Sequence, residues 1–217
     1  MTLKIATIPG RYLLRSLFTV NVSQIEPLPG GNVIIAVNHH NWVDPLLVTF
    51  FWPADLDLMY IGPRDANANT AWKKWLYDRY PGVILTEQRQ GWPGRDAYNS
   101  VLNGLNGGKS LTIFPEGDAF PVEGEVQPFA NGVIHFALKS GTPIIPVGLC
   151  GTAELYYKKS LLMRIGAPLF VPQATHVSKS ELAEIKETLQ GKISDLIRGY
   201  QDPQVARKPM RWLTHLL

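Results

Sequence analysis

The sequence has almost no cysteine and no long uninterrupted apolar segment. Cys150 is the only cysteine among 217 residues, which excludes an internal disulfide and a zinc site built from several thiolates. The longest apolar run, residues 45–54, has about half of the roughly 20 residues that a membrane-spanning helix requires. The N-terminus lacks an apolar core followed by a small-residue cleavage site, so we expect no cleaved signal peptide.

Acidic residues are absent from both ends of the chain. Residues 1–20 and 203–217 each carry three basic residues, although the net charge of the whole chain is only +3. Basic ends around a slightly acidic body do not resemble a nucleic-acid-binding stripe, so we expect no nucleic-acid partner. They do suit an anionic membrane surface that the termini touch.

Both ends also show helical periodicity, which predicts short amphipathic helices within residues 1–22 and 203–217. Such helices either pack on the domain or lie in a membrane interface, and having one at each end favours a membrane lipid surface as partner. The expected apolar faces are Tyr12, Leu13, Leu17 and Val20 at one end, and Trp212, Leu213, Leu216 and Leu217 at the other.

The remaining chain has the pattern of one folded domain. A content of 45% hydrophobic and 18% charged residues argues against disorder. Within a core at residues 33–199, short apolar runs alternate with segments of helical periodicity. We therefore predict a single α/β domain over residues 1–217, a layered fold with a mainly parallel sheet flanked by helices. The expected strands are 33–37, 56–61, 83–86, 111–114 and 143–149. One expected helix begins at Asp44-Pro45, with Asp44 as its N-cap, and another begins at a capping box of Ser178 and Glu181. The other expected helices cover 70–80, 95–105 and about 129–140.

The strongest candidate for catalysis is the segment Asn38-His39-His40-Asn41-Trp42-Val43-Asp44. It follows a predicted strand, at the edge of an open α/β sheet where ligands bind. A histidine can take a proton from a hydroxyl, and a carboxylate that accepts its other N–H orients it and stabilises the imidazolium. His39 and Asp44 can meet across a tight loop, although helix capping alone would also explain Asp44 before Pro45. Adjacent histidines rarely share one ion and no third ligand is evident, so we expect no metal.

A second candidate segment, Phe114-Pro115-Glu116-Gly117, follows another predicted strand at the same edge. Gly117 permits close approach of the backbone to a ligand, and Glu116 can bind a hydroxyl or brace the loop. A turn built by Pro115 and Gly117 is the alternative explanation for the same residues.

In this order the segments resemble the glycerolipid acyltransferase family, which includes the lysophosphatidic acid acyltransferases. The first family signature is Asn-His, four residues and then Asp, and Asn38, His39 and Asp44 match it. The third is Phe-Pro-Glu-Gly-Thr-Arg, of which residues 114–117 match, and the proline-flanked strand 143–147 matches the fourth. Residues 129–132 and 165–168 also follow the family pattern, so that the resemblance extends from about residue 33 to 197.

The resemblance implies transfer of a fatty acyl group from an acyl-CoA or acyl-carrier-protein thioester to a lysophospholipid hydroxyl. The family's default acceptor is 1-acylglycerol 3-phosphate, which gives phosphatidic acid. His39 would be the general base and Asp44 its partner. The thioester is a co-substrate, so no resident cofactor is expected. The implied location is peripheral or monotopic on a membrane, at its cytoplasmic face.

Two positions depart from the family pattern. Asp118-Ala119 stands where the third signature ends Thr-Arg, and that arginine helps to hold the acceptor's phosphate in the family. The arginine of the second signature comes one residue late, at Arg89, with Arg95 as a substitute. These departures leave open an acceptor without a terminal phosphate, a thioesterase or esterase that uses water, and a non-catalytic lipid-binding protein. The candidate substrate-binding residues are Asn38, Arg89, Arg95, Pro115, Glu116 and Gly117.

Overall fold

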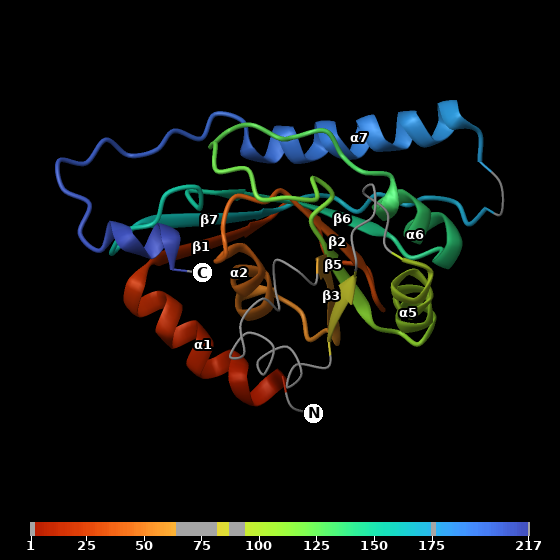
Figure 1. The fold of residues 1–217 in the computed structure, drawn as a ribbon, viewed down its shortest axis with the longest axis horizontal. Helices are drawn as coiled ribbons and strands as arrows, with labels where there is room; N and C mark the ends of the chain where they lie inside the picture. Colours follow the sequence, from red (N-terminus) through yellow and green to blue (C-terminus); the bar gives the residue numbers. More distant parts are fainter. Residues whose placement is uncertain (1–2, 64–81, 87–93, 175–176, 217) are drawn as a thin grey trace.

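A single twisted sheet organises the chain (Figure 1). The computed structural model describes residues 3–63, 82–86, 94–174 and 177–216. Within these ranges the sheet has seven strands in the order β1-β7-β6-β2-β5-β3-β4. All neighbouring strands run parallel except β6 and β7, which are antiparallel. The strands are β1 (Thr19–Gln24), β2 (Ile34–Val37), β3 (Leu58–Pro63), β4 (Val83–Thr86), β5 (Ser110–Ile113), β6 (Ile144–Cys150) and β7 (Ser160–Ile165).

Helices cover both faces of the sheet, so that the central strands are buried on both sides. In β2, Ile35 and Val37 belong to one core with α1 and α2, while Ile34 and Ala36 belong to the other with α5, α6 and α7. This double burial explains the uninterrupted apolar run that predicted the strand. The helices of the described chain are α1 (Leu3–Leu17), α2 (Asp44–Phe51), α5 (Arg95–Asn106), α6 (Gly132–Ser140), α7 (Lys179–Ile197) and the short 3-10 helix η1 (Arg211–His215).

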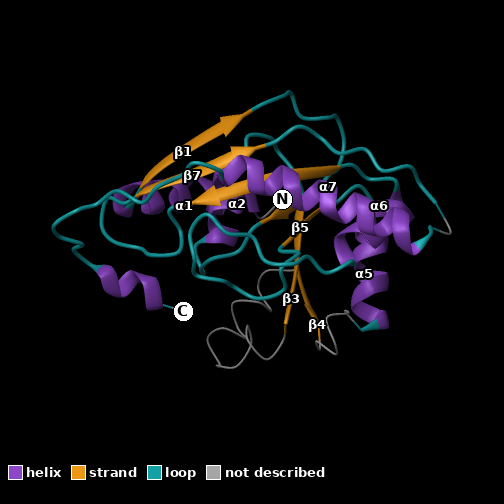
Figure 2. Cartoon of the chain, turned by 90° about the horizontal axis from the view of Figure 1, so that it is seen from above, coloured by secondary structure: helices purple, strands orange, loops and turns teal. Residues whose placement is uncertain are grey.

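The predicted α/β fold is confirmed, and the five expected strands form within three residues of their expected bounds. Two further strands, β1 and β7, were not predicted. β1 is an edge strand whose side chains are mostly exposed, and β7 alternates buried and half-buried positions, so neither contains a continuous apolar run. Figure 2 shows these two strands at one side, turned away from β3 and β4 by the twist of the sheet. The helix expected at 70–80 lies outside the described residues.

Two predicted helix starts had different outcomes. Ser178 caps α7 as expected, because its hydroxyl accepts the N–H of Glu181 and the Glu181 side chain accepts the N–H of Ser178. The prediction that Asp44 caps α2 was wrong by one residue. Val43 occupies that position, Asp44 is the first helical residue, and no side chain caps the helix. The Asp44 carboxylate turns back toward the preceding loop instead.

The terminal segments differ from the two expected amphipathic helices. α1 ends at Leu17, so that Val20 lies in β1 rather than on the helix. Leu14 and Phe18 are buried, whereas Tyr12 and Leu13 are 73% and 62% exposed. At the other end η1 spans only five residues, with Leu213 buried and Trp212 58% exposed. None of the helices in the described ranges is long and apolar enough to cross a membrane.

Candidate active site

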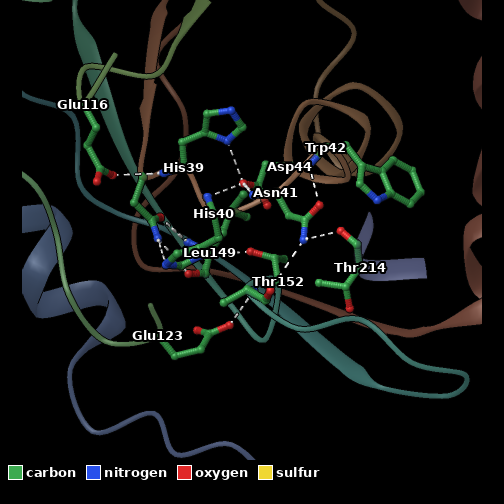
Figure 3. A network of polar contacts seen from close by, with 12 residues as sticks. His39, His40, Asn41, Trp42, Asp44, Glu116, Glu123, Leu149, Thr152 and Thr214 are labelled. Atoms are coloured by element: carbon green, nitrogen blue, oxygen red, sulfur yellow. Dashed lines mark hydrogen bonds and ion pairs between the residues drawn. The ribbon is translucent and has the colours of Figure 1, made fainter. Parts of the chain in front are cut away.

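Three loops meet at one edge of the sheet. β5, β2 and β6 are parallel neighbours, with Ala36 opposite Ile113 and Val37 opposite Val147. Their carboxyl ends therefore lie side by side, and the segments that follow them come together there. One of them, residues 38–44, follows β2 and ends at the start of α2; we call it the catalytic loop after the predicted role of His39. Figure 3 shows it between the loop after β5 and the turn after β6.

His39 and Asp44 form the predicted pair. Nδ1 of His39 lies 2.8 Å from Oδ2 of Asp44 (Figure 3). An ionised carboxylate only accepts hydrogen bonds, so Nδ1 carries the proton and Nε2 is the nitrogen that can take one. The side chain of Asp44 is fully buried, whereas that of His39 is 19% exposed. Solvent therefore reaches the imidazole of His39 but not its carboxylate partner.

The Asp44 carboxylate also builds the loop that contains it. Its Oδ2 atom accepts the backbone N–H of His40 at 2.6 Å and that of Asn41 at 2.8 Å, in addition to the imidazole. Three donors on one oxygen close the loop around the carboxylate and hold it against His39. The five-residue spacing of the motif follows from this ring of hydrogen bonds.

The loop after β5 supports His39 from the other side. The Phe114 ring stacks on the imidazole with 4.2 Å between ring centroids and 26° between ring planes. Glu116 accepts the N–H of His39 at 3.0 Å with Oε1 and that of Gln127 at 2.9 Å with Oε2. Burial raises the pKa of the Glu116 carboxyl, against the effect of these two backbone hydrogen bonds. Of its two predicted roles, the structure shows Glu116 bracing the loop.

The other predicted substrate-binding residues lie in different surroundings. Asn38 is fully buried and ties the start of its loop to β6, since its amide accepts the N–H of Leu149 at 2.7 Å and donates to the Leu149 carbonyl at 3.0 Å. Gly117 has φ +89°, a conformation that favours glycine, in the turn that follows Pro115. Arg95 is exposed at the first position of α5. Arg89 lies outside the described residues, and direct contact of any of these residues with substrate stays a prediction.

Several residues of the site carry no sequence signal that we could interpret. His40 is buried, and its Nδ1 atom lies 2.9 Å from the hydroxyl of Thr152 in the turn after β6. Glu123 accepts the N–H of Ala153 at 2.8 Å and so joins the loop after β5 to the same turn. These contacts join positions 30 and 112 residues apart, which explains why local patterns miss them. Throughout the described residues, no three histidine, cysteine or acidic side chains come together in a way that could hold a metal ion.

A comparison with known families covers the segment that contains this site. A model described as Acyltransferase matches residues 19–150, a range that contains His39, Asp44 and residues 114–117. The chain belongs to this acyltransferase family. It is an enzyme, an O-acyltransferase. The predicted catalytic pair and the loop after β5 thus lie inside the part of the chain that matches the family.

Individual relatives agree with this assignment. The acyltransferase is 25% identical over 182 residues to a 1-acyl-sn-glycerol-3-phosphate acyltransferase of Bacillus subtilis, covering 82% of this chain and 87% of that protein. It is 30% identical over 170 residues to a protein of the same name from Borreliella burgdorferi, covering 77% and 65% respectively. The crystal structure of the 1-acyl-sn-glycerophosphate (LPA) acyltransferase PlsC from Thermotoga maritima has the same fold, with a TM-score of 0.67 and 23% identity over 92% of this chain and 81% of that chain.

Proposed function

We propose that the enzyme transfers a fatty acyl group from a CoA or acyl-carrier-protein thioester to the free hydroxyl of 1-acylglycerol 3-phosphate, giving phosphatidic acid. The observation that carries the proposal is the 2.8 Å contact between His39 and Asp44, which leaves Nε2 of His39 available as a base. The names of the relatives support the acceptor. The acyltransferase would thus act in phospholipid biosynthesis.

The geometry suggests a direct transfer. Nε2 of His39 takes the proton of the acceptor hydroxyl as its oxygen attacks the thioester carbonyl. The tetrahedral intermediate collapses, the C–S bond breaks, and the departing sulfur takes the proton back from the imidazolium. Asp44 stabilises the imidazolium in between. An acyl-enzyme on Cys150 is disfavoured because burial raises the pKa of this thiol to about 12.

We also propose that the enzyme works at the cytoplasmic face of a membrane, as a peripheral or monotopic protein. The proposed acceptor is an amphiphile, and each end of the chain carries an exposed aromatic next to an exposed basic residue, Arg11-Tyr12 and Arg211-Trp212. The turn after β6 joins these ends, because Lys158 donates its N–H to the Leu17 carbonyl and Tyr157 donates its own to Pro209. Tyr12 in α1 and Trp212 in η1 are 73% and 58% exposed, as aromatic residues that enter a membrane interface would be. Flotation with anionic vesicles tests this proposal, and binding that is unchanged in Tyr12→Ser and Trp212→Ser variants would contradict it.

Thiol release tests the reaction itself. Wild type and His39→Ala are assayed with acyl-CoA, with and without 1-acylglycerol 3-phosphate, and the lipid product is identified. We expect acceptor-dependent release that yields phosphatidic acid, reduced about 10²- to 10⁴-fold in the variant. Steady release without an acceptor would instead identify a thioesterase, and unchanged turnover of His39→Ala would exclude His39 as the base.

One observation favours a second acceptor class. Asp118 and Ala119 are both exposed in the loop that touches His39, where the family's third signature has Thr-Arg. A carboxylate near a phosphate is unfavourable, so a lyso-glycolipid or lyso-aminolipid without a terminal phosphate is the alternative acceptor. A panel of acceptors in the same assay separates the two, because turnover confined to phosphate-free lipids would exclude 1-acylglycerol 3-phosphate.

A further inference from the structure

Two residues in the middle of the catalytic loop are held by the far end of the chain. The indole Nε1 of Trp42 donates to the Leu213 carbonyl at 2.8 Å. The side-chain amide of Asn41 donates to the Thr214 carbonyl at 3.3 Å (Figure 3). Both acceptors belong to η1, more than 170 residues along the sequence. The Leu213 carbonyl also accepts the N–H of Leu216 at 3.4 Å, so the indole of Trp42 is its second and closer donor.

η1 is itself fixed in place. The Thr214 hydroxyl accepts the N–H of Leu155 at 2.9 Å and donates to the Leu155 carbonyl at 3.1 Å. The Leu213 side chain is 2% exposed and packs in the same core as Val43 and Leu47. Backbone and side chain together therefore determine where the two accepting carbonyls lie.

The segment that leads to η1 is anchored as well. Residues 198–216, which we call the C-terminal strap, follow α7 and return along the surface to the catalytic loop (Figure 1). The fully buried ammonium of Lys159 lies 2.7 Å from Asp202, which also accepts the hydroxyl of Tyr200 at 2.7 Å. Glu154 forms ion pairs with Lys208 and Arg211. Because the side chain of Lys159 is fully buried, its charge depends on Asp202 as partner, and this pair holds the strap at that point.

We infer that the C-terminal strap is a positioning element of the active site, and the inference rests on the proposed role of His39 as base. Asn41 provides the connection, because its side chain binds Thr214 while its backbone N–H binds Oδ2 of Asp44 at 2.8 Å. Trp42, the next residue, is held by Leu213. Trp42 and Thr214 do not touch the reacting atoms, and they keep the carboxylate oriented toward Nδ1 of His39.

The size of the effect follows from the geometry of catalysis. A misplacement of about 1 Å in a catalytic group can cost about 100-fold in rate. Loss of one hydrogen bond at the strap removes only part of the restraint, so we expect an intermediate decrease. The loop remains closed by the three donors on Asp44, so we expect kcat to change rather than KM.

Two tryptophans allow a matched experiment. Trp42→Phe removes the indole N–H that binds Leu213. Trp52→Phe is the same chemical change at a buried indole N–H for which the described part of the chain provides no hydrogen-bond partner. We expect kcat of Trp42→Phe to fall about tenfold with KM unchanged, and kcat of Trp52→Phe to stay within about twofold of wild type. Equal kcat values for the two variants would overturn the inference.

Thr214 gives an independent variant pair. Thr214→Val removes the hydroxyl that binds Leu155, whereas Thr214→Ser keeps it. We expect the valine variant to lose kcat in the same way as Trp42→Phe and the serine variant to regain most of it. The thermal unfolding midpoints of the two tryptophan variants and the two Thr214 variants are also measured. If the strap had a purely structural role, kcat would fall only as far as the fraction of unfolded protein rises.

A spectroscopic measurement keeps this inference separate from the proposed function. In wild type the Nδ1 proton of His39, hydrogen-bonded to Asp44, should give a downfield proton NMR signal. We expect this signal to broaden or shift in Trp42→Phe and Thr214→Val and to persist in Trp52→Phe and Thr214→Ser. If wild type lacks acyl transfer but the signal responds in this way, the proposed function fails and the positioning role stands. If acyl transfer is present but neither kcat nor the signal responds, the positioning role fails alone.

Discussion

Oδ2 of Asp44 lies 2.8 Å from Nδ1 of His39 and accepts two backbone N–H groups of the intervening loop as well. One carboxylate oxygen thus orients the base and determines the shape of the loop that carries it. Helix capping, which the sequence offered as an alternative reason for Asp44, does not occur, because the carboxylate faces the loop rather than the first turn of α2. The residue is placed for chemistry, and its substitution should affect turnover directly.

Asp44→Asn should lower kcat by about 10³- to 10⁴-fold, since the amide carries no charge to stabilise the imidazolium and can favour the wrong tautomer. Acyl transfer measured by thiol release gives the result. Asp57→Asn is the matched control, because Asp57 is exposed and its ion pair with Lys109, at 3.9 Å, should contribute little. An Asp44→Asn enzyme within tenfold of wild type would show that the carboxylate has no catalytic role.

Phe114→Leu should reduce kcat by about 2- to 10-fold. The leucine keeps an apolar side chain beside His39 but loses the ring stack at 4.2 Å, and aromatic pairs contribute about 0.5–1.5 kcal/mol beyond burial. Phe114→Tyr retains the stack and serves as the control. The steady-state rates of the three enzymes decide the question: a leucine variant as fast as wild type would mean that Asp44 alone orients the imidazole.

The sequence contained enough information to predict the sheet centre and the catalytic pair. β2 and β6 are buried on both faces and appear as uninterrupted apolar runs. His39 and Asp44 are only five residues apart, so a single loop is enough to bring them together. The capping box at Ser178 is likewise local, since all of its hydrogen bonds join residues three apart. Features that depend on neighbours in the chain were therefore accessible.

Features that depend on contacts between residues far apart in the sequence could not be predicted. Leu213 and Thr214 reach Trp42 and Asn41 through backbone carbonyls, which every residue has, so no residue type marks these contacts. β1 has an exposed pattern typical of a loop and becomes a strand only by pairing with β7. Glu116 was predicted to bind a hydroxyl or brace its loop, and only the fold shows the hydrogen bonds to His39 and Gln127.

Ala119→Arg should improve the use of a phosphate-bearing acceptor. Ala119 is exposed in the loop beside His39, at the position where the family's third signature has arginine, and a guanidinium there can form charge-assisted hydrogen bonds with a phosphate. We expect KM for 1-acylglycerol 3-phosphate to fall about fivefold, with no change for a lyso-lipid that lacks the phosphate. Ala119→Gln controls for side-chain length. Equal changes in KM for both acceptors would show that this position does not face the phosphate.

Cys150 should be unreactive in the folded enzyme. It is buried at the end of β6, and burial raises the pKa of its thiol from 9.0 to about 12. At pH 8 only about 1 in 10⁴ native molecules then carries the thiolate, against about 1 in 10 unfolded ones. A disulfide-forming thiol reagent at pH 8 should therefore label the enzyme in denaturant and leave the native protein unlabelled. Rapid native labelling would show that the thiol is accessible.

The same pKa has a consequence for stability. Between pH 9 and about 12 the native thiol stays protonated while the unfolded one loses its proton, so the native state binds more protons and stability falls as pH rises. Below pH 9 this contribution is fully present. Free energies of unfolding measured at pH 8, 9 and 10 should fall more steeply for wild type than for Cys150→Ala, by at most about 1.4 kcal/mol per pH unit. The comparison uses the slope of the unfolding free energy against pH. The cost of the smaller side chain is the same at each pH and the lysines titrate in both proteins, so neither changes the difference between the slopes. Parallel slopes would contradict the raised pKa.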